Sequence, residues 1–137
     1  MKKRKVFVLG GCGFIGSNIV RKLATRGGCE ITVGDFIGPS NQDLKFMQFI
    51  KDNEIRFLDM DFTKFESFQY LDDAYDDFYM LASVVGVNNT LSNPHDVIRI
   101  NTSLIFNSLE WLRFNNTKNV LFTSTSECYV GSINKFN

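Results

Sequence analysis

The sequence has few cysteines, no excess of charge of either sign and no long apolar run. Its three cysteines lie far apart and form no CxxC pair, so it predicts neither a metal site nor a disulfide framework, and we expect a cytoplasmic protein. Fifteen basic residues balance fifteen acidic ones, which argues against a nucleic-acid partner or an anionic membrane surface. No apolar stretch approaches the ~20 residues that a membrane helix needs. The N-terminal apolar run is also too short for a signal peptide, and we expect no membrane partner.

Short apolar runs instead alternate with segments of helical spacing. The β-branched and aromatic runs predict strands at 5–9, 30–33, 55–58, 78–82 and 120–123. Apolar residues at helical spacing predict helices at 15–26, 43–50, 65–71 and 95–115. We expect a loop at 36–41 and a longer connection at 84–94, and residues 124–137 show no clear period. Alternation of this kind indicates parallel βαβ units with right-handed crossovers. We therefore predict one α/β domain over residues 1–137.

The same spacing predicts which helix faces are buried. The expected apolar stripes are Ile15, Ile19, Val20, Leu23 and Ala24 on the first helix, Leu44, Met47 and Ile50 on the second, and Val97, Ile100, Leu104, Ile105, Leu109 and Leu112 on the longest.

Four glycines in seven residues follow the first predicted strand, in Leu9-Gly-Gly-Cys-Gly-Phe-Ile-Gly16. They fit two registers, one on Gly11, Gly13 and Gly16 and the other on Gly10, Gly13 and Gly16. A glycine-rich turn between a strand and a helix lets the backbone approach a dinucleotide pyrophosphate, whose charge the helix N-terminus stabilises. A structural turn without a phosphate is the alternative. The context favours a Rossmann-type doubly wound parallel sheet of about five strands, order 3-2-1-4-5, in a three-layer αβα arrangement.

Asp35 ends the second predicted strand, 19 residues after Gly16. A carboxylate at that place accepts hydrogen bonds from the adenosine ribose hydroxyls and repels a 2′-phosphate. The sequence therefore predicts NAD, in preference to NADP, as the cofactor.

The glycine-rich segment resembles the TGGxGFIG opening of the extended short-chain dehydrogenase/reductases that act on nucleotide sugars, with Leu9 in place of threonine. These are NAD-dependent epimerases, dehydratases and decarboxylases, and the resemblance covers the whole chain. It implies NAD as cofactor and a UDP-, dTDP- or GDP-linked sugar as substrate. It also implies that Phe14, Ile15 and Phe36 belong to the cofactor site.

The resemblance continues after the later predicted strands. Met60-Asp-Phe-Thr63 is similar to the family's GD(I/L)x motif, which implies that Asp61 and Phe62 hold the adenine. Met80-Leu-Ala-Ser83 resembles the family's HLAA, with methionine in place of histidine, so only the backbone role carries over. Asn101 matches a helix asparagine that fixes backbone near the active site; an ordinary surface asparagine is the alternative. The cofactor-binding residues implied here are Asp61, Phe62, Leu81, Ala82, Ser83, Asn101 and Thr123.

Residues 122–129, FTSTSECY, resemble the family's STSEVYG. Without the resemblance, serines and threonines after a strand would be turn formers or helix caps. With it, Thr125 corresponds to the hydroxyl that bonds the sugar O4. Ser126 and Glu127 correspond to a polar pair of decarboxylases and some 4,6-dehydratases. The resemblance thus implies Thr125, Ser126 and Glu127 as catalytic residues, whereas Tyr129 is not the catalytic tyrosine of the family, which belongs to a later YxxxK motif.

No YxxxK motif occurs in these 137 residues, and members of the family are much longer. We therefore expect the N-terminal, NAD-binding part of an epimerase, 4,6-dehydratase or decarboxylase that acts through a 4-keto sugar, inactive by itself. The alternative is a non-catalytic NAD-binding sensor or regulatory module, which would not need the 125–127 trio.

The family also implies a homodimer through the helix at 94–115. Ile98, Phe106, Trp111 and Phe114 add apolar surface to that helix beyond the stripe that one subunit needs.

Overall fold

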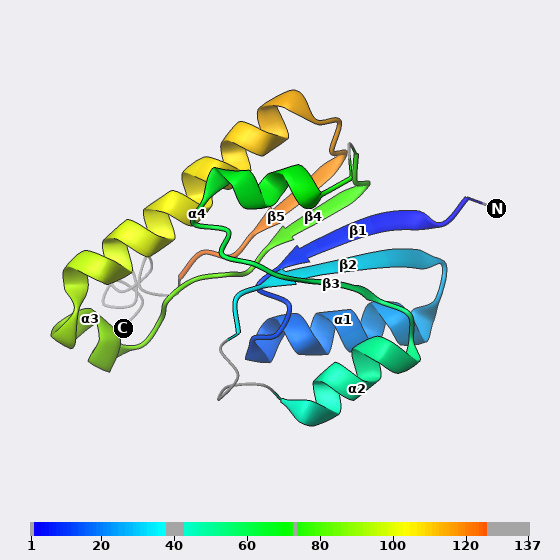
Figure 1. The fold of residues 1–137 in the computed structure, drawn as a ribbon, viewed down its shortest axis with the longest axis horizontal. Coiled ribbons are helices and arrows are strands. Elements are labelled where there is room, and N and C mark those ends of the chain that lie inside the picture. Colours follow the sequence, from blue (N-terminus) through cyan, green and yellow to red (C-terminus); the bar gives the residue numbers. More distant parts are fainter. Residues whose placement is uncertain (1, 38–42, 73, 126–137) are drawn as a thin grey trace, which may run out of the picture.

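A five-stranded parallel sheet forms the centre of the computed structural model, which describes residues 2–37, 43–72 and 74–125 (Figure 1). Its strand order is β3-β2-β1-β4-β5, which confirms the predicted doubly wound fold. Val8 at the centre of the sheet pairs with Val33 on one side and Tyr79 on the other. The strands are β1 (Arg4–Leu9), β2 (Cys29–Asp35), β3 (Arg56–Asp59), β4 (Asp77–Met80) and β5 (Asn119–Phe122).

Helices cover both faces of this sheet, which makes three layers (Figure 1). On one face lie α1 (Phe14–Arg26) and α2 (Leu44–Asp52). On the other lie the 3-10 helix η2 (Phe65–Tyr70) and the long helix α4 (Pro94–Phe114). Because all strands run parallel, their carboxyl ends meet along one edge of the sheet.

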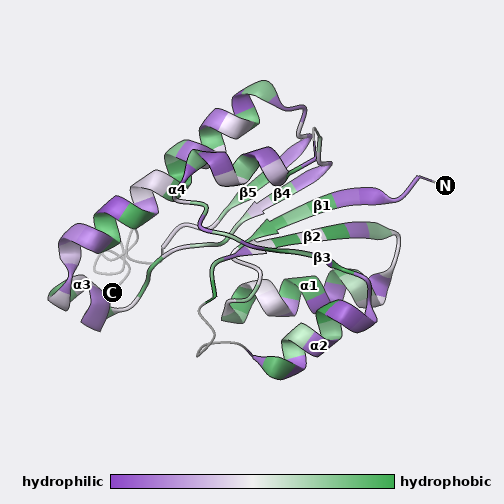
Figure 2. Ribbon diagram, viewed as in Figure 1, coloured by the Kyte–Doolittle hydropathy of each residue, from purple (hydrophilic) through white to green (hydrophobic). Residues whose placement is uncertain are grey.

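Side chains of β1 alternate between two apolar cores, and the apolar colour runs through the middle of the sheet (Figure 2). Phe7 and Leu9 face η2 and α4, whereas Val6 and Val8 face α1 and α2, and all four are at most 1% exposed. Burial on both faces is what a near-continuous apolar strand predicts. The first core comprises Phe7, Leu9, Phe62, Phe68, Leu71, Tyr75, Phe78, Met80, Leu104 and Trp111; the second comprises Val6, Val8, Val20, Ile31, Val33, Phe46, Ile50 and Ile55.

The predicted helix faces need correction at several positions. Leu44 is 76% exposed, and Phe46 is buried with Ile50 instead. The Arg21 guanidinium of α1 lies 5.1 Å from the centre of the Phe46 ring, so packing between helices selects the aromatic face. Ile15, expected in the stripe of α1, is 56% exposed at the first turn of that helix.

On α4 the buried face is also rotated from the predicted one. Trp111, expected to add outer surface, is 6% exposed and packs on Phe78 at a ring-centroid distance of 5.8 Å. Leu109, expected in the core, is 57% exposed. The large indole fills the space over β4 that a leucine would leave partly empty.

The predicted connection 84–94 contains a short helix, α3 (Val87–Ser92). Its polar side chains return hydrogen bonds to the backbone one turn earlier: Asn89 to Val85, Thr90 to Gly86 and Ser92 to Asn88. No residue of α3 is buried, so apolar periodicity could not indicate it.

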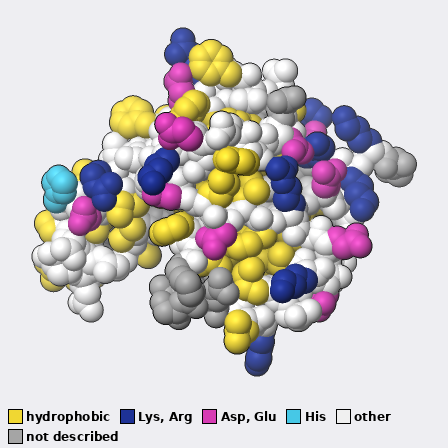
Figure 3. Space-filling view, in the orientation of Figure 1, with side chains coloured by type: hydrophobic (Ala, Val, Ile, Leu, Met, Phe, Trp, Pro, Cys, Tyr) yellow, Lys and Arg dark blue, Asp and Glu magenta, His cyan; other side chains and the backbone are white. Residues whose placement is uncertain are grey.

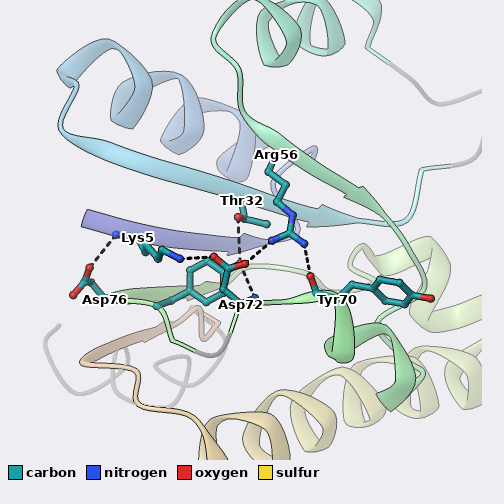
Figure 4. Close-up of polar contacts among 7 residues, drawn as sticks. Lys5, Thr32, Arg56, Tyr70, Asp72 and Asp76 are labelled. Atoms are coloured by element: carbon teal, nitrogen blue, oxygen red, sulfur yellow. Dashed lines mark hydrogen bonds and ion pairs between the residues drawn. The ribbon is translucent and has the colours of Figure 1, made fainter. Parts of the chain in front are cut away.

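The amino-terminal half of the sheet is held by a polar network (Figure 4). Asp72 accepts hydrogen bonds from Lys5 Nζ at 2.6 Å and Arg56 Nη1 at 2.7 Å. The buried Tyr75 hydroxyl donates to Thr32 Oγ1 at 3.2 Å. These bonds tie the segment after η2 to β1, β2 and β3.

Candidate functional site

A pocket of about 500 Å³ opens at the carboxyl ends of the strands. In open α/β sheets this edge, at the point where the strand order reverses, is where ligands bind. Nine of the predicted cofactor residues line it: Gly10, Gly13, Asp35, Phe36, Asp61, Phe62, Leu81, Ala82 and Ser83.

Three glycines of the turn after β1 are required by the protein's own packing. Gly10 has a φ of +85°, and a Cβ there would lie 2.4 Å from the Ala82 nitrogen. A Cβ on Gly11 would lie 2.6 Å from Val33 Cγ1. A Cβ on Gly16 would lie 2.2 Å from the Gly10 oxygen, so this glycine lets α1 pack against the turn.

Gly13 is different. It caps α1 with φ −67° and ψ 171°, a conformation open to any residue. Among the described residues, a Cβ there would meet only the Gly10 oxygen, at an ordinary 3.4 Å. Backbone conformation and packing therefore do not require a glycine at this pocket-lining position, where serine, threonine, asparagine or aspartate would cap the helix at least as well. A ligand that approaches the backbone at the N-terminus of α1 does give one.

Asp35 ends β2 beside this turn. Its carboxylate accepts hydrogen bonds from the Cys12 nitrogen at 2.7 Å and the Phe36 nitrogen at 2.8 Å. Burial raises the pKa of Asp35 above the usual aspartate value, and these two amide bonds oppose the rise. A carboxylate has about four lone-pair positions, so acceptor capacity remains beyond these two amides.

Cys12 lies between the glycines and lines the same pocket. Burial, and then the negative charge of Asp35, raise the pKa of its thiol to about 12. The thiol is therefore protonated at neutral pH and contributes a small, neutral surface to the pocket.

Asp61 and Phe62 follow β3 and lie on the opposite wall. Asp61 Oδ1 accepts hydrogen bonds from the Thr63 nitrogen at 3.0 Å and Thr63 Oγ1 at 2.6 Å, which fixes the turn. The Phe62 ring is 2% exposed and packs on Phe7 and Phe68. The turn after β3 thus presents its backbone to the pocket from a rigid base.

Asn101 of α4 holds the backbone after β4. Its Oδ1 accepts a hydrogen bond from the Val84 nitrogen at 2.7 Å, and its Nδ2 donates to the Val84 oxygen at 3.0 Å. Thr123, after β5, donates from its hydroxyl to the Met80 oxygen at 3.3 Å. Neither side chain lines the pocket; both act on the backbone around it.

The remaining predicted residues lie beside the pocket or outside the described part of the chain. Phe14 and Ile15 begin α1 and are exposed, and Gly16 is buried under the turn. Thr125 is exposed just after β5, at the same edge of the sheet. Ser126 and Glu127, predicted as catalytic, lie outside the described residues.

Nine pocket residues were not predicted. Cys12, Ile37, Met60, Thr63 and Val84 adjoin predicted residues in the sequence, so extending each motif by one position would have found them. Ile100 and Leu104 fit the core stripe of α4, and no sequence signal separates a pocket wall from a core. The nine are Leu9, Cys12, Ile37, Met60, Thr63, Val84, Arg99, Ile100 and Leu104.

The model of the NAD dependent epimerase/dehydratase family matches residues 6–134. The chain belongs to this family. The match confirms the predicted resemblance and, at the level of the family, the predicted NAD cofactor.

Relatives from distant organisms include nucleotide-sugar enzymes. The chain is 26% identical over 133 residues to a human UDP-glucose 4-epimerase, covering 91% of this chain and 38% of the relative. It is 30% identical over 128 residues to a UDP-N-acetyl-alpha-D-glucosaminuronate decarboxylase of Bacillus cytotoxicus, covering 93% and 38%. The chain therefore spans less than half the length of these relatives.

Solved structures show the same arrangement. A UDP-N-acetylglucosamine 4-epimerase from Methanobrevibacter ruminantium, in complex with UDP-N-acetylmuramic acid, matches with TM-score 0.73 and 27% identity over 94% of this chain and 40% of that one. A UDP-glucose 4-epimerase from Thermus thermophilus, in complex with NAD, matches with TM-score 0.70 and 26% identity, covering 88% and 37%.

Within the described ranges, no helix is both long and apolar enough to cross a membrane. The same residues contain no group of three or more histidine, cysteine or acidic side chains placed to hold a metal ion.

Proposed function

We propose that the pocket at the carboxyl edge of the sheet holds NAD, with its pyrophosphate at Gly13 and the N-terminus of α1. The observation that supports this most strongly is Gly13, a glycine that neither backbone conformation nor packing requires, next to helix amides that have no side-chain cap. Asp35 binds the adenosine ribose hydroxyls, and the turn at 61–62 faces the adenine. When bound, NAD supplies reversible hydride transfer.

Calorimetric titration of the chain with NAD and NADP tests this site. We expect saturable binding of NAD and at least tenfold weaker binding of NADP, because Asp35 repels a 2′-phosphate. Asp35→Ala should weaken NAD binding by about 1–3 kcal/mol, as expected for lost charge-assisted hydrogen bonds. Equal affinity for both dinucleotides would contradict the placement of the ribose.

We also propose that the whole protein modifies a nucleotide sugar through a 4-keto sugar, as an epimerase, dehydratase or decarboxylase. The kinds of enzyme among its relatives support this class. Thr125 lies at the pocket edge of the sheet, where its hydroxyl would hydrogen-bond the sugar O4. Ser126 and Glu127 would take part in the acid–base steps that follow oxidation of the sugar.

These 137 residues alone should not turn over nucleotide sugars. They contain no YxxxK motif, and a tyrosine with the ordinary pKa of about 10 is a poor base at neutral pH. Mass spectrometry of UDP-, dTDP- and GDP-sugars incubated with the chain and NAD should detect no product. Appreciable turnover would show that the chemistry is misassigned.

We propose, finally, that the whole protein forms a homodimer through α4. Ile98, Phe106 and Phe114 are 66–71% exposed on this helix, and hydrophobic side chains lie at the surface along it (Figure 3). Phe106→Ser should reduce self-association in light scattering. Leu44→Ser, which removes a 76% exposed apolar side chain from α2, should not; equal effects would argue against α4 as the interface.

A further inference from the structure

The strands β2 and β3 end in two aspartates that lie side by side. Asp35 and Asp59 are register partners in the parallel ladder. Partners of this kind project from the same face of a sheet, with backbones about 5 Å apart. The carboxyl edge at the proposed ribose position therefore carries two acidic residues, whereas the sequence motif predicts only Asp35 there.

Asp59 also fixes the wall of the pocket. Its Oδ1 accepts a hydrogen bond from the Ile37 nitrogen at 3.2 Å, while Asp35 Oδ1 accepts one from the Phe36 nitrogen. Phe36 and Ile37 both line the pocket. The two carboxylates thus bind consecutive amides of one short segment, and this segment turns away from β2 next to the ribose position.

The charge of Asp59 reaches the pocket. Burial is the main cause of the raised pKa of Asp35, and the negative charge of Asp59 adds to it. Asp59 contributes in the same direction to the raised pKa of Cys12, after burial and Asp35. A 2′-phosphate brought to this place would be repelled by the negative charges of both aspartates.

We propose that Asp59 is a second specificity-determining residue for the cofactor, which excludes dinucleotides with a 2′-phosphate together with Asp35 and holds the 36–37 segment in position. This inference rests on the proposed NAD site. It implies that neutralising Asp35 alone leaves part of the discrimination in place.

Asp59→Asn is the deciding variant, because an amide oxygen still accepts the bond from Ile37 while the charge is lost. We expect its NAD affinity to stay within about twofold and its NADP affinity to rise about tenfold at low salt. A tenfold change is about the size of the repulsion energy between one carboxylate and a doubly charged phosphate across water. Added salt should narrow the difference, because exposed charges are screened. Asp35→Asn/Asp59→Asn should bind NADP better than either single variant.

Asp52→Asn is the matched control, because it removes the same charge from the far end of α2, where Asp52 accepts a bond from Gln48. It should leave the ratio of the two affinities unchanged. The inference is overturned if Asp59→Asn and Asp52→Asn have the same ratio of NAD affinity to NADP affinity. It is also overturned if Asp59→Asn weakens the binding of both dinucleotides equally. If the unaltered chain binds no NAD, the proposed function fails as well. If the unaltered chain binds NAD but Asp59→Asn leaves the ratio of the two affinities unchanged, only this inference fails.

Discussion

Replacing Gly13 with alanine tests whether this glycine is required for the stability of the fold or for the binding of the ligand. The backbone at Gly13 suits alanine, and the new Cβ would make one ordinary contact, 3.4 Å from the Gly10 oxygen. The lost freedom of the unfolded chain stabilises a glycine-to-alanine variant by about 0.4–1 kcal/mol, whereas alanine is a poorer N-cap than glycine by about 1 kcal/mol or less. We therefore expect an intact fold, with a free energy of unfolding in urea within about 1 kcal/mol of that of the unaltered chain.

The same methyl group should damage NAD binding. In the proposed site it stands where the pyrophosphate approaches the amides at the start of α1, so charge-assisted bonds would lengthen or break. A loss of about 2–3 kcal/mol, roughly 30- to 150-fold in Kd, is expected. Calorimetry with NAD on the folded variant measures it.

Gly16→Ala is the comparison variant. Its Cβ would lie 2.2 Å from the Gly10 oxygen and 2.7 Å from Gly11 Cα, so it should lower the free energy of unfolding by about 3 kcal/mol or more. A Gly13→Ala protein that is folded and binds NAD normally would refute the placement of the pyrophosphate. A Gly13→Ala protein as unstable as Gly16→Ala would refute the claim that the fold does not need this glycine.

Three further predictions concern individual contacts. Asp72→Asn should lower the free energy of unfolding by about 1 kcal/mol at neutral pH, since partly exposed ion pairs are weak. Lys5 and Arg56 hold the pKa of Asp72 below its usual value, so the stabilisation by Asp72 is complete above the unfolded pKa of about 4 and is lost as pH falls through the lower folded pKa. In urea denaturation, the difference in free energy of unfolding between the unaltered chain and Asp72→Asn should be smaller at pH 3 than at pH 7. The native Cys12 thiol, with its pKa at about 12, should react with iodoacetamide at pH 8 at least about a hundredfold more slowly than in the unfolded chain, as followed by peptide mass spectrometry; equal rates would contradict its burial. Asn101→Leu should lower the free energy of unfolding by about 1–2 kcal/mol, because both Val84 backbone groups lose their partner, and a denaturation midpoint equal to that of the unaltered chain would contradict this.

The sheet and half of the pocket residues could be predicted because local signals determine them. The run around Val8 is apolar on both faces, which indicates a central parallel strand, and Asp35 follows the next such run. Parallel topology then brings the strand ends together without any knowledge of side-chain packing.

What could not be predicted depends on contacts between distant residues. Trp111 and Leu109 are both compatible with helical periodicity, and only the space over Phe78 decides which is buried. The helix α3 has no apolar stripe at all. Asp59 looks like an ordinary acidic residue after a strand until the register with Asp35 is known.

The most direct test of the NAD site is an amide chemical-shift titration of the isotope-labelled chain with NAD. We expect the amide signals of Gly13, Phe36 and Ser83 to shift together and saturate with one Kd, while that of Lys5 at the opposite end of β1 stays unchanged. Shifts confined to the outer face of α4, or none at the turn that contains Gly13, would contradict it.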